Sequence, residues 1–153
     1  IFFRKCFFFI DSMITRCATT PRYIHNSFLL RMASSWKASD AVQRAKSSSR
    51  GSFELDLGDA AAAIAEYSVW KGPDGTLVLE IPHTFVPQTH RGQGLAGVVT
   101  EAAFHYAQEH RMKVLPTCTY VAGLFLDKRP HLASLCISRS LLPETPEPAT
   151  LPE

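Results

Sequence analysis

The sequence predicts one small domain of the mixed α/β class. Strand-like apolar patterns run through residues 52–86, a long amphipathic helical pattern covers residues 93–110, and a β-rich stretch follows at 113–121. A strand, a long helix and a second strand form a β-α-β unit, in which the two strands lie parallel. The chain has 153 residues and a hydrophobic fraction of 46%, which is enough to build one core.

Two strands are expected first, and ordered structure should begin near Gly51. Residues 52–57 alternate between polar and apolar, so Phe53 and Leu55 share one face of a half-buried strand. Residues 61–70 also favour a strand, although their alanines are compatible with a helix, because glycines bracket a run that contains Ile64 and Trp70.

A third strand is expected after the turn at residues 71–75, antiparallel to the second. Gly75 can supply the positive φ that this turn needs. The strand covers residues 76–86 and is interrupted by Pro82, which has no N–H to donate to a neighbouring strand. We therefore expect the strand to bulge or to part from its neighbour at Pro82, and to end at Pro87.

The predicted helix begins directly after a glycine-rich turn. Its apolar stripe has helical spacing and consists of Leu95, Val98, Val99, Ala102, Ala103, Tyr106 and Ala107. The turn carries Arg91, Gly92, Gln93 and Gly94, and the first N–H groups of a helix have no intrahelical partner. Together with the helix dipole, such a turn suits a phosphate group. Taken alone, however, it is equally compatible with a tight turn that carries one basic residue.

The remainder of the chain is less regular. Residues 113–121 are expected to form the second parallel strand, residues 122–126 to begin a helix, and residues 132–142 to dock on the domain. The proline-rich acidic tail, residues 143–153, should be disordered. Residues 1–50 carry nine Lys or Arg against two acids, which suits either an organelle transit peptide or an unstructured extension. The expected division is therefore 1–50, 51–130 and 131–153.

Several classes of function are disfavoured. A net charge of +2 does not predict a nucleic-acid partner, and the apolar runs are shorter than the ~20 residues of a membrane span. The four cysteines lack the spacing of a zinc site, so we expect free thiols and no metal. We expect a monomer, located in the chloroplast or mitochondrion if residues 1–50 are a transit peptide and otherwise in the cytoplasm or nucleus.

Three motifs carry a resemblance to a known superfamily. They are His-Thr-Phe-Val-Pro at 83–87, Arg-Gly-Gln-Gly-Leu-Ala at 91–96 and Cys-Thr-Tyr-Val at 118–121, with the long helix between the last two. This combination resembles the GNAT superfamily of N-acetyltransferases. It is most similar to very short plant and bacterial members that carry an H-T-x-V-P and R-G-x-G-L-A signature. The resemblance implies a mixed, mostly antiparallel sheet with acetyl-CoA bound where two parallel strands, ending at Val86 and around Thr119, splay apart.

The resemblance also implies which residues hold the donor. The pyrophosphate would rest on the backbone N–H groups of the turn and first helical residues, which are Gly92, Gln93, Gly94, Leu95 and Ala96. The pantetheine arm would pair with the backbone of Phe85 and Val86 as an added strand would. Arg91 is placed to pair with phosphate oxygens, or is simply solvated.

Two residues are candidates for the chemistry. Cys118 occupies the position of a cysteine in the short members, where it could accept the acetyl group or assist near the thioester; the alternative is a small buried residue. His83 could relay a proton from the amine, because histidine is a common general acid and base, or be a structural histidine beside Pro82. Glu80 as a general base and Tyr120 as a donor to the departing thiolate are weaker candidates.

The resemblance implies an N-acetyltransferase that moves acetyl from acetyl-CoA to an amine, either a protein lysine or a small amine. The alternative is a coenzyme A-binding sensor or interaction module with little catalysis, which the absence of a strong general base favours. A degenerate gene product is a third interpretation.

Overall fold

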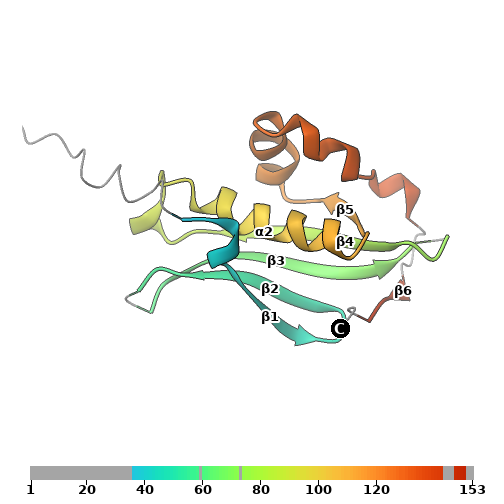
Figure 1. Cartoon of the computed structure of the whole chain (residues 1–153), viewed down its shortest axis with the longest axis horizontal. Coiled ribbons are helices and arrows are strands. Elements are labelled where there is room, and N and C mark those ends of the chain that lie inside the picture. Colours follow the sequence, from blue (N-terminus) through green and yellow to red (C-terminus); the bar gives the residue numbers. More distant parts are fainter. Residues whose placement is uncertain (1–35, 59, 73, 143–146, 151–153) are drawn as a thin grey trace, which may run out of the picture.

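A six-stranded sheet forms the body of the protein in the computed structural model, which describes residues 36–58, 60–72, 74–142 and 147–150. Its strands run in the order β1-β2-β3-β4-β5, and β6 pairs with β3 (Figure 1). All pairings are antiparallel except that of β4 with β5, which is parallel. The predicted mixed, mostly antiparallel α/β fold is confirmed.

The three central strands follow the sequence pattern. β2 (Arg50–Asp56) pairs with β3 (Ala62–Lys71), and β3 pairs with β4 (Leu77–Phe85). Gly75 has a φ of 74° in the turn between β3 and β4, as the turn chemistry predicts. On β3 the buried residues alternate strictly with half-buried ones, because one face of the strand lies under the helix.

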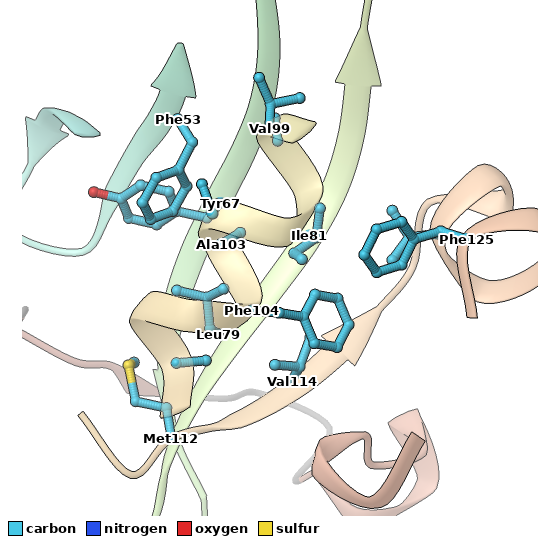
Figure 2. Packing of buried hydrophobic residues seen from close by; sticks show 14 of the residues in the cluster. Phe53, Tyr67, Leu79, Ile81, Val99, Ala103, Phe104, Met112, Val114 and Phe125 are labelled. Atoms are coloured by element: carbon cyan, nitrogen blue, oxygen red, sulfur yellow. The ribbon is translucent and has the colours of Figure 1, made fainter. Parts of the chain in front are cut away.

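The long helix α2 (Leu95–Glu109) covers this face of the sheet (Figure 1). The predicted stripe is buried along its length, except that Val98 and Tyr106 are half-buried. A second stripe of Gly97, Thr100 and Phe104 is also buried. Phe104 packs on Phe125 with ring centroids 5.3 Å apart, and Figure 2 shows the two rings facing each other from separate helices. The helix is therefore buried on two sides.

The strand predicted over residues 113–121 is wrong in its second half. β5 (Lys113–Pro116) has only four residues, and the chain becomes helical from Thr119, with a π-helical turn η3 (Val121–Phe125). Val121 and Phe125 are both buried in the main core, from one face of this helical turn. The helix predicted to begin at residues 122–126 is present, but it begins earlier, at Thr119.

The C-terminal segment packs on both faces of the sheet beside β5. It contains two short 3-10 helices, η4 (Pro130–Leu135) and η5 (Arg139–Leu141). Leu132 of η4 is buried in the main core, whereas Leu142, which follows η5, forms a small second core with Val78 and Leu115. The predicted disorder of the tail is contradicted for residues 147–150, since β6 (Glu147–Pro148) pairs with β3 and Ala149 is buried. The rest of the tail lies outside the described residues.

Ordered structure begins before Gly51. A 3-10 helix η1 (Ala38–Asp40) leads into β1 (Val42–Ser47), which pairs with β2 at the edge of the sheet. All six β1 residues are exposed, so the strand has no buried face to produce a hydrophobic alternation. Residues 1–35, the larger part of the stretch for which either a transit peptide or an unstructured extension is predicted, lie outside the described residues. In the part of the chain that the structure describes, no helix has the length and apolar character of a membrane span.

Candidate functional site

The site begins where β4 loses one of its two neighbours. β4 pairs with β3 along its whole length, from Leu77 to Phe85, but with β5 only through four residue pairs that end at Ile81 and Pro116. Beyond Ile81, the edge of β4 that faces away from β3 has no strand partner among the described residues. This free edge, residues 82–85, can accept an extended ligand that carries amide groups.

Pro82 marks the start of the free edge. Opposite Tyr67 the pairing with β3 shifts register, from Ser68 with Glu80 to Glu66 with His83, so two β4 residues face one β3 residue. The interruption expected from the missing N–H of proline is confirmed, and the strand both bulges against β3 and parts from β5 there.

The glycine turn lies between the end of β4 and the start of α2. Gly92 and Gly94 have φ values of 80° and 77°, and Gly94 is the N-cap residue of α2. A β-carbon built on either glycine would meet no atom within 4 Å, so the backbone there is open to a ligand. Arg91 is exposed, and its Nε donates to the carbonyl oxygen of Val86 at 3.2 Å. This bond ties the turn to the end of β4.

The other donor-site candidates have distinct settings. Phe85 is 43% exposed at the end of the free edge, and Val86 is half-buried. Leu95 is buried in the core, so only its backbone is available to a ligand, while Gln93 and Ala96 are half-buried. The chain therefore places the predicted donor residues in one continuous run from the free edge to the first turn of the helix.

Cys118 follows β5 and precedes the helical turn, so its predicted place on a strand is wrong. Its backbone N–H donates to the carbonyl oxygen of Ile81 at 2.9 Å, which brings the residue to the last paired position of β4. Its side chain is half-buried against the main core, on the α2 side of the sheet. Cys118 therefore lies at the start of the free edge.

His83 lies on β4 close to Cys118 in the backbone, but its side chain belongs to the other face of the sheet. It is paired with Glu66, which alternates with the buried residues Ala65 and Tyr67 and so points away from α2. The imidazole is exposed and makes no hydrogen bond or ion pair with any described residue. The structure thus brings the two candidates to one strand end without direct contact between their side chains.

Tyr120 reaches toward the start of α2. A β-carbon built on Gly97 would lie 3.6 Å from its hydroxyl oxygen. Burial raises the pKa of this phenol above its ordinary value; the nearby charge of Arg129 lowers the pKa and that of Cys118 raises it. The phenol is therefore protonated at neutral pH.

Two buried hydroxyls near the site were not predicted from the sequence. Among the described residues, neither Thr84 Oγ1 on β4 nor Thr100 Oγ1 on α2 has a hydrogen-bond partner. Thr84 is paired with Ala65, which places it on the α2 side of the free edge. Single threonines within apolar patterns give no sequence signal, because their environment is set by which helix face is covered.

A separate hollow of about 450 Å³ lies between η1, β1 and the β2–β3 turn. Three carboxylates line it, and each already has a partner. Arg44 pairs with Glu54 at 2.8 Å, the N–H of Gly58 donates to Asp56 at 2.9 Å, and the N–H of Lys37 donates to Asp40 at 2.8 Å. We assign this hollow no part in the site.

Comparison with known protein families identifies the family to which the chain belongs. A family model described as GCN5-related N-acetyl-transferase matches residues 52–135. The chain belongs to this family. The match begins within β2 and ends with the last residue of η4, so it covers the free edge, the glycine turn, α2 and Cys118. Membership in the GCN5-related N-acetyltransferase family indicates acetyl transfer from acetyl-CoA.

The residues present fit this donor. The open glycine turn and the N–H groups of Leu95 and Ala96, which precede the first hydrogen bond of the helix, suit a pyrophosphate. The free edge of β4 suits the amide groups of a pantetheine arm, and the buried hydroxyl of Thr84 lies beside it. In this member of the family the candidate donor site thus consists mainly of backbone groups.

Proposed function

We propose that the protein transfers acetyl from acetyl-CoA to an amine acceptor, which is a protein lysine or a small amine. The observation that carries the proposal is the junction of the free β4 edge with the open glycine turn at the start of α2. A pantetheine arm along the edge and a pyrophosphate on the turn are the two parts of one coenzyme.

The backbone of residues 92–96 is the proposed pyrophosphate site. The helix dipole favours negative charge at this end of α2, and Arg91 can add a cation. The backbone of Phe85 and Val86 is the proposed partner of the pantetheine arm. Bound there, the donor supplies an activated acetyl thioester, so that orientation can contribute much of the rate.

Cys118 is the proposed chemical residue on the α2 side. Its thiol would lose a proton and form a bond from Sγ to the acetyl carbon, while the bond from that carbon to the coenzyme sulfur breaks and the coenzyme leaves as its thiol. An acceptor amine would then take the acetyl group and restore the cysteine. The second possibility is that Cys118 lines the thioester site while the amine attacks directly.

His83 is the proposed proton relay for the acceptor. Its imidazole is exposed on the face of the sheet opposite α2, so an acceptor that approaches from that face would meet it before Cys118. A neutral imidazole can accept the proton that the amine must lose.

The alternative function is a coenzyme A-binding module with little catalysis. It is favoured by one observation: no described imidazole or carboxylate is hydrogen-bonded to the Cys118 thiol. Binding without transfer would follow if neither residue acts as a base.

Incubation of the protein with acetyl-labelled coenzyme A, followed by intact mass and peptide mapping, tests these possibilities. We expect label on Cys118, loss of the label in Cys118→Ala, and transfer to an amine panel in the wild type. Binding without transfer to any amine would support the sensor function. A folded protein that does not bind the coenzyme would overturn both.

The role of His83 is tested separately with His83→Gln. We expect kcat to fall and to lose its decrease at acidic pH, while the affinity for coenzyme A is unchanged. His105→Gln, at an exposed position on α2, is the matched control. An unchanged pH profile of kcat in His83→Gln would mean that His83 has only a structural role.

A further inference from the structure

Glu80 lies at the last residue pairs that join β4 to β5, and its carboxylate is shared by three other segments. Its side chain is only 14% exposed. Oε2 accepts a hydrogen bond from the indole N–H of Trp70 on β3 at 2.5 Å, and Oε1 accepts one from the hydroxyl of Thr117 at 3.2 Å. The guanidinium of Arg139, from η5, lies 3.7 Å from Oε1. Both carboxylate oxygens are therefore engaged.

Thr117 connects this carboxylate to the residue beside it, Cys118. The Thr117 hydroxyl lies 3.2 Å from Glu80 Oε1 and 3.2 Å from the carbonyl oxygen of Ile81, so it bridges the side chain and the backbone of β4. The same Ile81 carbonyl accepts the backbone N–H of Cys118 at 2.9 Å. Two consecutive residues after β5 are thus held on β4 by one carboxylate and one carbonyl.

The contacts of Thr117 and Cys118 hold the chain to β4 where the pairing between β4 and β5 ends. The last parallel pair is Ile81 with Pro116, and a proline cannot donate a backbone hydrogen bond. Without the Thr117 and Cys118 bonds, nothing in the backbone ladder would fix the chain between Pro116 and the helical turn at Thr119.

We propose that Glu80 and Thr117 form a polar clamp that positions Cys118 at the start of the free edge of β4. This deepens the proposed function and rests on it, since it concerns the same site. Glu80 is a positioning residue in this arrangement, because its carboxylate contacts Trp70, Thr117 and Arg139 and acts on Cys118 through Thr117.

The clamp makes a specific distinction between variants. In Glu80→Gln the new amide can donate to Thr117 Oγ1, whose own proton then goes to the Ile81 carbonyl, and Trp70 keeps an acceptor. Glu80→Ala and Thr117→Val remove the bridge, whereas Thr117→Ser retains the hydroxyl. A role in base catalysis would instead make Glu80→Gln as harmful as Glu80→Ala.

The test uses the full chain and two readouts that do not require catalysis. Amide exchange reports the bond from the Cys118 N–H to Ile81, and the rate of alkylation by iodoacetamide reports the setting of the thiol. Cys136 is an internal reference in peptide mapping, because it lies outside the clamp. Burial raises the pKa of its thiol.

We expect Thr117→Val and Glu80→Ala to speed exchange of the Cys118 amide roughly three- to tenfold, as loss of one hydrogen bond allows. Cys118 alkylation should change by a similar factor, with Cys136 unaffected, and Thr117→Ser and Glu80→Gln should stay within about twofold of the wild type. In acetyl transfer, Thr117→Val should lower kcat and leave the KM for acetyl-CoA unchanged.

Three outcomes would overturn the clamp: unchanged exchange and alkylation in Thr117→Val, equal loosening of the whole molecule in that variant, or Glu80→Gln behaving like Glu80→Ala. Thr117 is exposed, so Thr117→Val can still be used to test the clamp if Glu80→Ala does not fold. If exchange and alkylation respond as expected but no acetyl is transferred by any variant, the clamp stands and the proposed function fails.

Discussion

The two flanks of β4 are built differently. On one flank β3 pairs with β4 from one end to the other, and the side chains between them and α2 form the largest part of the core. On the other flank β5 contributes four residue pairs, and the chain that follows is held by side chains, such as Phe104 against Phe125 and Arg129 with Glu101 at 2.9 Å. A ladder along the whole strand, with one bulge at Pro82, supports one side of β4, and the other side is left free for a ligand.

This difference shows how a small domain can keep a backbone edge available without exposing its core. Where β4 has no strand pairs on the β5 side, aromatic packing and polar contacts hold the chain that follows β5. Substitutions on the β3 flank should therefore affect global stability alone, whereas those on the β5 flank should also affect coenzyme binding and Cys118.

The largest expected effect is from Phe104→Ala. Phe104 is fully buried and packs on Phe125 (Figure 2), so we expect a loss of about 3–5 kcal/mol in the free energy of unfolding, measured with urea. Amide exchange should accelerate first in residues 113–126. The matched variant is Phe53→Ala on the other flank, also buried, which should cost a similar amount and leave that segment protected to the global limit. Equal local exchange in both variants would remove the proposed asymmetry.

The next largest is Gly94→Asp, which places a carboxylate at the N-cap of α2. A like charge against a pyrophosphate at a helix terminus should weaken coenzyme A binding by at least about tenfold in calorimetry. Gly94→Asn has the same size and tolerates a positive φ, so it separates charge from backbone strain. Gly75→Asp, at the opposite end of β4 with a φ of 74°, should leave binding unchanged. Wild-type affinity in Gly94→Asp would put the pyrophosphate elsewhere.

Alkaline pH should test both flanks together. Burial raises the pKa of Tyr67 on β3 and of Tyr120 beyond β5 above the ordinary value of about 10. The unfolded chain then loses these protons first, so the stability they provide is complete below about pH 10 and declines as pH rises through the folded values. Urea unfolding between pH 8 and 11 should show this decline, and Tyr67→Phe and Tyr120→Phe should each reduce its slope.

Tyr120→Phe should, in addition, change Cys118 alkylation, whereas Tyr67→Phe should not. The hydroxyl of Tyr67 accepts a hydrogen bond from Gln43 of β1 at 2.9 Å, toward the β1 edge of the sheet. An identical effect of both substitutions on Cys118 would contradict the separation of the two flanks.

The smallest expected effect is from Arg91→Ala. Arg91 is exposed, so its pairing with phosphate is screened, and we expect a two- to fivefold loss of coenzyme affinity that disappears at high salt. Lys128→Ala, at another exposed basic position, is the control. A larger loss in Arg91→Ala would mean that its bond to the Val86 carbonyl shapes the turn itself.

The sequence predicted the β3 flank well, because period-two alternation and turn glycines are local signals. It could not predict β1, whose six exposed residues carry no hydrophobic pattern, or β6, which is two residues paired at the end of β3. Thr119, Tyr120 and Val121 favour a strand by residue type, yet they are helical, because Val121 and Phe125 fill the core from one helical face.

The candidate site was predicted in outline for a similar reason. Arg91, the two glycines and Pro82 mark local backbone geometry, and the structure contains the turn and the bulge that they indicate. The clamp formed by Glu80 and Thr117 joins residues 37 positions apart, and its partner Arg139 lies farther still along the chain. Such contacts depend on tertiary packing and leave no signal in residue spacing.

The bulge at Pro82 has a consequence for how molecules of this protein meet one another. A free strand edge is a template on which a neighbouring chain can add a strand and start aggregation. Here the edge is only residues 82–85 long, it begins with a residue that has no N–H, and the bulge gives it extra twist. It can form hydrogen bonds with a short ligand that carries a few amide groups, but a full β-strand could not pair with it in regular register. The proline thus protects the protein in solution at high concentration while leaving the edge accessible.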